Sequence, residues 1–126
     1  MKTALVLFAH GARDPEWAAP MRRVQAAIQL RSPEQMVELA FLEFMAPTLP
    51  ECIAQLIGAG AEKLVILPMF IARGGHLKRE LPEMLDALRL SYPGVEFSLQ
   101  GAVGENEAVI QAMADVALAV LAPPDV

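Results

Sequence analysis

Short apolar runs alternate with amphipathic helical patterns along the whole chain, and this alternation limits the folds that the chain can adopt. The apolar runs cover residues 3–9, 36–42, 63–71 and 95–99. Strands that alternate with helices form parallel sheets with right-handed crossovers and helices on both faces. We therefore predict a three-layer α/β/α fold with a four-stranded parallel sheet, in one domain over residues 1–126.

The helical segments carry start signals and apolar stripes of their own. Asp14 can cap a helix that has Pro15 in its first position. Thr48 and Glu51 have the spacing of a capping box. We expect the third helix to follow His76, with Pro82 in its first turn, and the last helix to run from about 105 to 121. The stripes at helical spacing are Trp17, Met21, Val24 and Ile28; Ile53, Leu56 and Ile57; Leu81, Met84, Leu85 and Leu88; and Val109, Met113, Val116 and Val120. The doubly wound arrangement that results is flavodoxin-like.

The composition is apolar for a small domain, with 55% hydrophobic residues and a mean hydropathy of +0.39. The excess is spread over short runs, which argues against a membrane span. Two interpretations stay open: a well-filled core, or extra apolar surface that a second copy covers. The net charge of −5 and the lack of a basic stripe argue against nucleic acid as a partner. Cytoplasm is the expected location, because the first apolar run lacks a signal-peptide cleavage site.

Three polar residues come just after the first three apolar runs. His10 follows residues 3–9, Glu43 follows 36–42, and His76 closes the loop after 63–71; the chain has only these two histidines. The carboxyl ends of parallel strands meet at one edge, where open α/β sheets bind ligands. Two imidazoles and a carboxylate suit a divalent transition metal. A single histidine after a strand is more often structural, but the joint pattern favours a metal site.

Several common chemistries are excluded by missing motifs. The sequence has no G-x-S-x-G elbow, which argues against a serine hydrolase. It has no G-x-x-x-x-G-K-[ST] loop, so no nucleotide cofactor is expected. Gly11 allows a sharp turn directly after His10. The lone cysteine, Cys52, is expected to be a small buried apolar residue.

Residues around the same edge are candidates for binding a ligand. Gly74 and Gly75 could give His76 room to move, although ordinary loop chemistry also explains them. A basic rim would hold an anionic ligand, although such residues are more often solvated surface charges. The basic residues are Arg13, Arg73, Lys78 and Arg79. Apolar residues near the strand exits either belong to the core or line a flat cavity; they are Phe44, Met45, Met69 and Phe70.

These motifs resemble those of the sirohydrochlorin cobaltochelatase family, a group of class II chelatases. The segments that carry the resemblance are HGARDP at 10–15, FLEFMAPTLPECI at 41–53 and LPMFIARGGHLKRELP at 67–82. The resemblance places the metal-contacting histidines on His10 and His76 and their acidic partner on Glu43. Lys78 and Arg79 stand where family members often have acidic residues, which leaves rim contacts and substrate choice open.

The resemblance implies a chelatase-like fold and the insertion of a divalent metal, with Co²⁺ preferred, into sirohydrochlorin without ATP. The short, single-domain form implies a homodimer that completes the tetrapyrrole cleft. It does not separate Co²⁺ from Ni²⁺ or Fe²⁺, so a nickel- or ferrochelatase is a second possibility. A non-catalytic metal carrier that uses the same site, and an interaction domain with an unused pocket, are also compatible with these residues.

Overall fold

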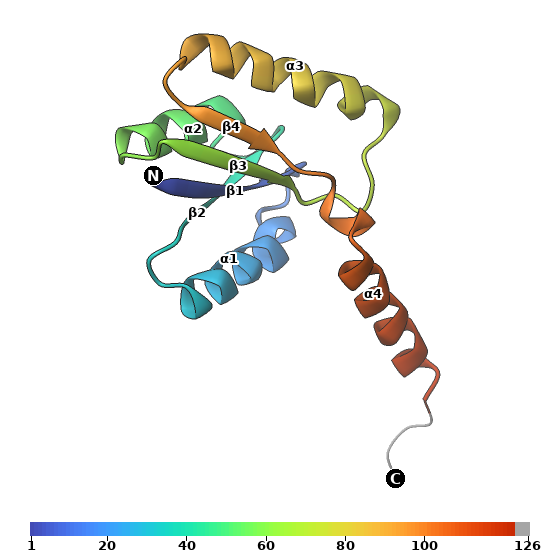
Figure 1. The fold of residues 1–126 in the computed structure, drawn as a ribbon. Coiled ribbons are helices and arrows are strands. Elements are labelled where there is room, and N and C mark those ends of the chain that lie inside the picture. The colour runs from blue at the N-terminus through green and yellow to red at the C-terminus, as the bar shows by residue number, and fades with distance from the viewer. Residues whose placement is uncertain (123–126) are drawn as a thin grey trace.

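A parallel sheet forms the centre of the computed structural model, which describes residues 1–122 (Figure 1). Its strands lie in the order β2-β1-β3-β4, and every neighbouring pair is parallel. The strands are β1 (Thr3–Ala9), β2 (Met36–Phe41), β3 (Lys63–Pro68) and β4 (Glu96–Leu99). The helices are α1 (Ala19–Arg31), α2 (Leu49–Gly58), α3 (Gly75–Ser91) and α4 (Glu107–Val120), with 3-10 turns η1 (Pro15–Ala18) and η2 (Val103–Glu105). Within the described residues, the predicted fold class is confirmed.

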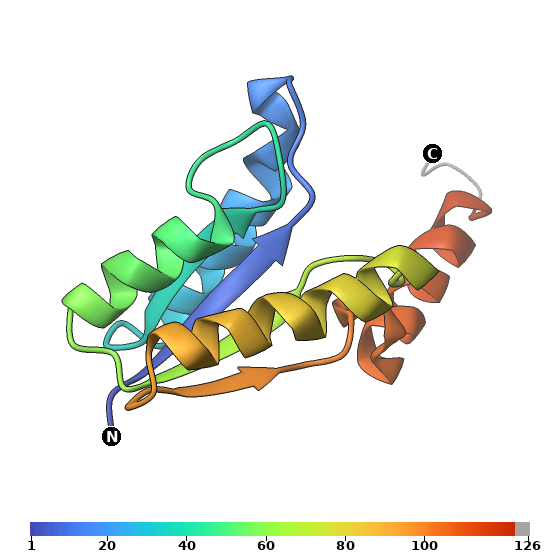
Figure 2. The same cartoon turned by 90° about the horizontal axis from the view of Figure 1, so that it is seen from above.

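Helices α2 and α3 cover one face of the sheet, and α1 lies on the other (Figures 1 and 2). Between the sheet and the helix pair lies a core that includes Phe8, Ile53 and Leu81, all with 0% exposure. The smaller core under α1 includes Leu7 and Phe41. β1 lies between β2 and β3 and is buried on both faces, which explains its nearly continuous apolar sequence.

The predicted capping box at the start of α2 is confirmed. The Thr48 side chain accepts a hydrogen bond from the Glu51 N–H at 3.3 Å, and Glu51 Oε1 accepts one from the Thr48 N–H at 3.0 Å. The hydrogen bond from the Thr48 N–H to the Glu51 carboxylate lowers the pKa of Glu51, and the Thr48 side chain adds to the effect. The cap fixes the start of α2 after β2. It therefore sets the length of the loop that carries Glu43.

Helix α3 begins earlier than the sequence indicates. We expect it after His76 with Pro82 in the first turn, but α3 starts at Gly75, and Pro82 lies in its interior. Gly74 adopts an extended conformation before the first turn, and its carbonyl accepts a hydrogen bond from the Lys78 N–H at 3.1 Å. Leu77 is buried one turn before Leu81, so the apolar face also starts earlier. His76 is therefore a helical residue and not a loop residue.

Two further points concern the ends of elements. β3 ends at Pro68, within the apolar run 63–71, and residues 69–74 form the loop that leads to α3. Trp17 is 41% exposed, although it was expected on the inward stripe of the first helix. It lies in η1, and a 3-10 turn has three residues per turn, which takes Trp17 out of register with the stripe of α1.

Helix α4 projects away from the sheet (Figure 1). The apolar residues of α4 are at the predicted positions. However, none of the residues of α4, all of which the structure describes, is buried. The sheet is thus covered by three helices in residues 1–122 and not by four. No helix in this part of the chain has both the length and the apolarity to cross a bilayer.

The Cys52 thiol is predicted to be unreactive while the protein is folded. Its side chain has 0% exposure, and burial raises its pKa to about 12, with a smaller contribution from the charge of Glu38. Since the thiolate is the nucleophile, iodoacetamide at pH 8 should label Cys52 at least about a hundredfold more slowly in buffer than in urea. Mass spectrometry of timed samples measures this, and equal rates would contradict the burial.

The same pKa shift gives a pH dependence with a definite sign. The folded pKa lies above the unfolded value of ~8.5, so folding favours the protonated thiol. Its contribution to stability is complete below about pH 8.5 and is lost as the pH rises towards 12.

Candidate functional site

The ends of β1, β2 and β3 bring the candidate residues to one edge of the sheet. Ala9 pairs with Phe41, and Phe8 pairs with Pro68, so these strands finish side by side. His10 directly follows β1, and Glu43 lies two residues beyond β2. His76 reaches the same edge from the first turn of α3. The parallel register therefore gathers residues that are far apart in the sequence.

Hydrogen bonds hold the His10 and Glu43 segments together beyond the strands. The Leu42 N–H donates to the Ala9 carbonyl at 2.9 Å, and the Glu43 N–H donates to the His10 carbonyl at 3.0 Å. Gly11 follows with φ +89°, and a Cβ there would overlap the carbonyl oxygen of Glu43. Glycine is therefore required for the close approach of these two segments.

The imidazole of His10 rests on the ring of Phe70. Their ring centroids are 4.2 Å apart with an interplanar angle of 31°. Phe70 is 3% exposed and packs against Phe8, with centroids 6.0 Å apart. Phe70 is thus a core residue that supports His10, whereas the sequence left open whether it lines a cavity. The stacking restricts the His10 ring while its edge stays at the surface.

His76 has an acidic partner on its own helix. Its Nε2 lies 2.8 Å from Oε1 of Glu80, one turn further along α3. A carboxylate that accepts a hydrogen bond from one ring nitrogen fixes the tautomer and orientation of the imidazole, so the other nitrogen is available to a metal. Glu80 was not among the predicted site residues. The sequence does contain a signal for Glu80, the i, i+4 spacing from His76. This spacing brings the two side chains together only if His76 is part of a helix.

The two histidines and Glu43 line the same hollow, which has a volume of about 560 Å³. Its lining residues are His10, Leu42, Glu43, Gly74, His76, Leu77 and Glu80. The three polar residues are exposed. Within residues 1–122, no three His, Cys, Asp or Glu side chains stand close enough together to form a metal cluster. The site is therefore an open hollow with histidines and carboxylates on its wall, and not a closed metal cage.

Among the residues predicted to bind substrate, Gly74 alone lines this hollow within the described part of the chain. Arg13 lies over the ring of Phe44, with Cζ 4.9 Å from the ring centroid. The Arg13–Phe44 pair belongs to the loops after β1 and β2. Phe44 is 58% exposed with φ 65°. Met69 is half-buried against the core under α1, on the other face of the sheet.

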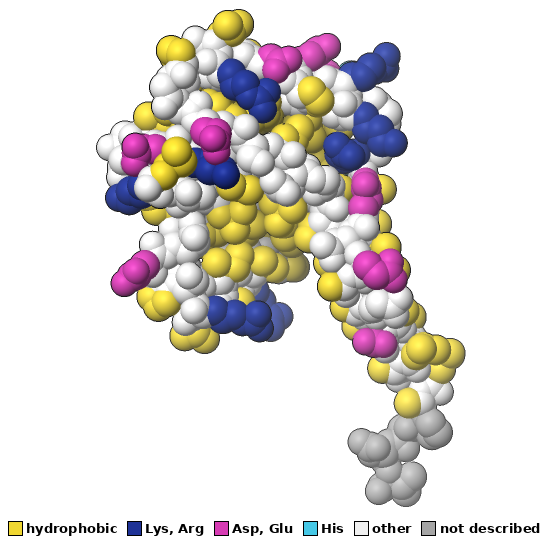
Figure 3. Space-filling view, viewed as in Figure 1, with side chains coloured by type: hydrophobic (Ala, Val, Ile, Leu, Met, Phe, Trp, Pro, Cys, Tyr) yellow, Lys and Arg dark blue, Asp and Glu magenta, His cyan; other side chains and the backbone are white. Residues whose placement is uncertain are grey.

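None of the basic residues of the third loop and of α3 lines the hollow. Arg73 Nε lies 3.9 Å from Oε1 of Glu105, and the Arg73 N–H donates to the same oxygen at 3.4 Å. Gly75 and Lys78 are exposed in the first turn of α3, and Arg79 is exposed directly after it. Figure 3 shows Lys and Arg side chains gathered over this end of α3. The start of α3 therefore carries exposed basic side chains next to Glu80, which lines the hollow.

The fold and this hollow define a class of protein: a parallel α/β domain with two histidines and a glutamate at the carboxyl edge of its sheet. The CbiX family model matches residues 4–119. The chain belongs to the CbiX family.

The chain is similar to a cobaltochelatase in sequence and to a CbiX protein in fold. The sirohydrochlorin cobaltochelatase of Methanococcus aeolicus is 39% identical over 82 residues, which cover 65% of this chain and 57% of that protein. The chain therefore spans less than two thirds of that relative's length. A crystal structure of a CbiX protein from Marinobacter aquaeolei has a TM-score of 0.81 at 28% identity, and the match covers 94% of this chain and 97% of that one.

A longer protein contains the same fold. The sirohydrochlorin chelatase SirB from Bacillus subtilis subspecies spizizenii, solved in complex with cobalt, matches with a TM-score of 0.80 over 95% of this chain and 51% of that chain. Its identity is 22%, so it shows the fold alone. About half of that longer chain lies outside the match.

Proposed function

We propose that this chain is a metal chelatase that inserts a divalent ion, with Co²⁺ as the first choice, into sirohydrochlorin without ATP. One observation carries the proposal: His10, Glu43 and His76 line one open hollow at the carboxyl edge of the sheet, in a member of the CbiX family. The names of its relatives support the substrate and the reaction. A cytoplasmic location is part of the proposal.

The residues of the hollow suit the transient binding of a metal substrate. Neutral imidazole nitrogens bind Co²⁺, Ni²⁺ and Fe²⁺. A closed four-ligand site would retain the ion, whereas an open one leaves positions for the pyrrole nitrogens. The macrocycle must lose two protons as the metal enters, and the carboxylate of Glu43 would accept them. His10 and His76 would hold the ion from two sides of the hollow.

The rim suits a polycarboxylate such as sirohydrochlorin. Helix α3 begins beside the hollow, and its N-terminal end carries a partial positive charge. The first turn contains no acidic residue. Lys78 and Arg79 add positive charge at the start of α3, and the Glu80 carboxylate that follows them lies 2.8 Å from His76 Nε2. Such a combination attracts carboxylates, and guanidinium groups bind them in a bidentate manner. In a chain with a net charge of −5, this local positive region favours an anionic ligand on the α3 side.

We also propose that two copies of the chain pair to form the working enzyme. Large apolar side chains are exposed on α4, including Val116 at 67% and Val120 at 79%. This exposed apolar surface supports a second copy that faces the first.

An insertion assay tests the proposed function. Purified protein is mixed with sirohydrochlorin and Co²⁺, Ni²⁺ or Fe²⁺ in turn, and the tetrapyrrole absorbance is followed against a protein-free reaction. We expect acceleration with at least one ion, and the ratio of kcat/KM values identifies the preferred metal. Binding of Co²⁺ by calorimetry without any acceleration would identify a metal carrier and overturn the proposal.

Glu80 is predicted to assist His76 in this reaction. Glu80→Gln replaces the charged acceptor at 2.8 Å from His76 Nε2 with a neutral amide. Loss of a carboxylate that orients a metal-binding histidine typically costs about 10–100-fold, so kcat/KM for the metal should fall by that factor. Glu83→Gln, an exposed site on the same helix, is the control and should have no effect. Equal rates for the two variants would show that Glu80 does not assist His76.

A further inference from the structure

Helix α4 has the composition of a buried helix but lies in the open. Its polar and charged residues, Glu107, Gln111 and Asp115, fall on one stripe at i, i+4 and i+8, and the remaining positions are apolar. The Gln111 Nε2 donates to Glu107 Oε1 at 2.8 Å along this stripe. Every other side of the helix presents alanine or a larger apolar residue, and such helices are normally covered by protein. The large exposed residues are Ile110, Met113, Val116, Leu118 and Val120.

Part of the sheet also lacks a cover. Parallel sheets are normally covered on both faces, but on the α1 side no described helix lies over β3 and β4 (Figure 1). Val65, Leu67 and Met69 are half-buried there. Figure 3 shows an apolar surface in the concavity between this part of the molecule and α4.

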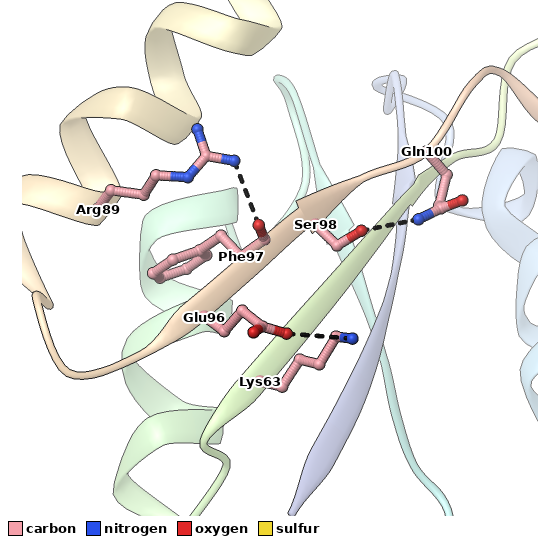
Figure 4. A network of polar contacts seen from close by, with 6 residues as sticks. All are labelled: Lys63, Arg89, Glu96, Phe97, Ser98 and Gln100. Atoms are coloured by element: carbon pink, nitrogen blue, oxygen red, sulfur yellow. Dashed lines mark hydrogen bonds and ion pairs between the residues drawn. The ribbon is translucent and has the colours of Figure 1, made fainter.

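The edge of this uncovered face is polar. Ser98, next to Val65 in the register, accepts a hydrogen bond of 2.8 Å from Nε2 of Gln100, which directly follows β4 (Figure 4). The Lys63–Glu96 ion pair, at 3.1 Å, lies at the far end of the same face (Figure 4). The uncovered face of the sheet is therefore an apolar strip with polar side chains at its border. Helix α4 has the matching pattern, an apolar surface bordered by a polar stripe.

The exit of the chain from β4 directs α4 away from its own sheet. The Gly104 N–H donates to the Phe70 carbonyl at 2.9 Å, and a Cβ at Gly104 would overlap the Ile71 carbonyl. The contacts of Glu105 with Arg73 add a second attachment. Asn106 then caps α4, accepting from the Ala108 N–H at 2.9 Å. Because η2 is attached to the loop after β3, the start of α4 is held in its outward direction.

We infer that two copies of the chain exchange α4, so that the helix of each copy covers the β3–β4 half of the other copy's sheet. The lengths agree: a helix of 14 residues spans about 21 Å, and six-residue β3 spans about 20 Å. A hollow of about 320 Å³ lies between Leu67 and Asn106, where α4 leaves the sheet. The apolar side of α4 and the uncovered face of β3 and β4 belong to the same chain. Reciprocal exchange of α4 would cover both surfaces in each copy and form a closed, two-fold symmetric pair.

This inference rests on the proposed pairing of two copies and adds how they pair. It is independent of the metal chemistry, since its readout is the mass of the assembly and not turnover. A paired protein that does not exchange helices, and a paired protein that does not insert metal, are separate outcomes.

Mass measurement of variants over a dilution series tests the exchange. The wild-type protein should be a dimer. Val116→Glu on α4 and Val65→Lys on the sheet should each raise the dimer dissociation constant at least about tenfold. Gln111→Glu adds the same charge to the polar stripe of α4 and should leave the dissociation constant unchanged.

Mixing the two charged variants distinguishes exchange between copies from contacts within one copy. A mixed pair has one unaltered helix–sheet contact, and its other contact joins the introduced carboxylate to the introduced ammonium group, which carry opposite charges. The mixture should therefore dimerise more strongly than either variant alone. If Val65→Lys loses its far-ultraviolet circular dichroism, Val65→Gln takes its place. A monomeric wild type, a dimer insensitive to Val116→Glu, or a mixture no stronger than the single variants would each overturn the exchange.

Discussion

Replacing either His10 or His76 with alanine is expected to abolish metal insertion. Each substitution removes one of the two imidazoles of the hollow, and the remaining residues would hold a divalent ion too weakly to present it to the macrocycle. We expect kcat/KM with Co²⁺ to fall by more than about a hundredfold in each variant, beyond the loss typical of a supporting residue. The measurement is the insertion assay with saturating sirohydrochlorin.

The loss must be separated from unfolding, and the exposure of both side chains makes this practical. His76 is 76% exposed at the side chain, and His10 is a surface residue stacked on Phe70. Surface substitutions of this kind usually change stability by less than about 0.5 kcal/mol. Urea unfolding of both variants should therefore resemble that of the wild type. Near-normal turnover in both would remove the histidines from the mechanism.

That the candidate residues gather at one edge of the sheet could be predicted, because this depends on strand order only weakly. His10 and Glu43 follow apolar runs directly, and any parallel arrangement of those strands brings their ends to one edge. The register Ala9↔Phe41 then puts the two loops side by side. What the sequence could not supply is the orientation of the third residue. His76 precedes a proline at 82, and the usual preference of proline for a first turn displaced the predicted helix start.

That shift concealed Glu80. A carboxylate four residues after a histidine is a neighbour only on a helix, so the His76–Glu80 pair is visible once α3 is known to begin at Gly75. Phe70 was ambiguous for a related reason. An apolar residue at a strand exit can face the core or the cavity, and here it lies beneath His10 with 3% exposure.

The apolar composition had two interpretations, and α4 shows where part of the excess lies. The stripe through Met113 and Val116 has helical spacing, so the sequence predicts a helix at the correct place. Spacing does not say what covers a stripe. The direction of α4 depends on contacts such as that between Gly104 and Phe70, which join segments more than thirty residues apart. No local pattern in the sequence encodes them.

Gly11→Ala is expected to damage both stability and activity. Gly11 has φ +89°, and an added Cβ would overlap the Glu43 carbonyl oxygen. Backbone strain of this kind costs about 1–3 kcal/mol, and relief of the overlap requires the loops after β1 and β2 to separate. We expect the free energy of unfolding to fall by roughly 2–4 kcal/mol, measured by urea unfolding.

The loss of activity should exceed what the loss of stability explains. The hydrogen bond of 3.0 Å from the Glu43 N–H to the His10 carbonyl sets the spacing of these two residues. A displacement of about 1 Å at a reacting site can cost about a hundredfold in rate, so kcat/KM should fall strongly at temperatures where the variant is still folded.

Gly74→Ala is the matched control for this prediction. Gly74 also belongs to the hollow, but its φ is −69° and nothing lies within 4 Å of an added Cβ. The same methyl group should therefore leave the free energy of unfolding nearly unchanged. If both alanine variants had the wild-type stability, the close approach of the His10 and Glu43 segments would not depend on glycine, and the geometry of the hollow would need another explanation.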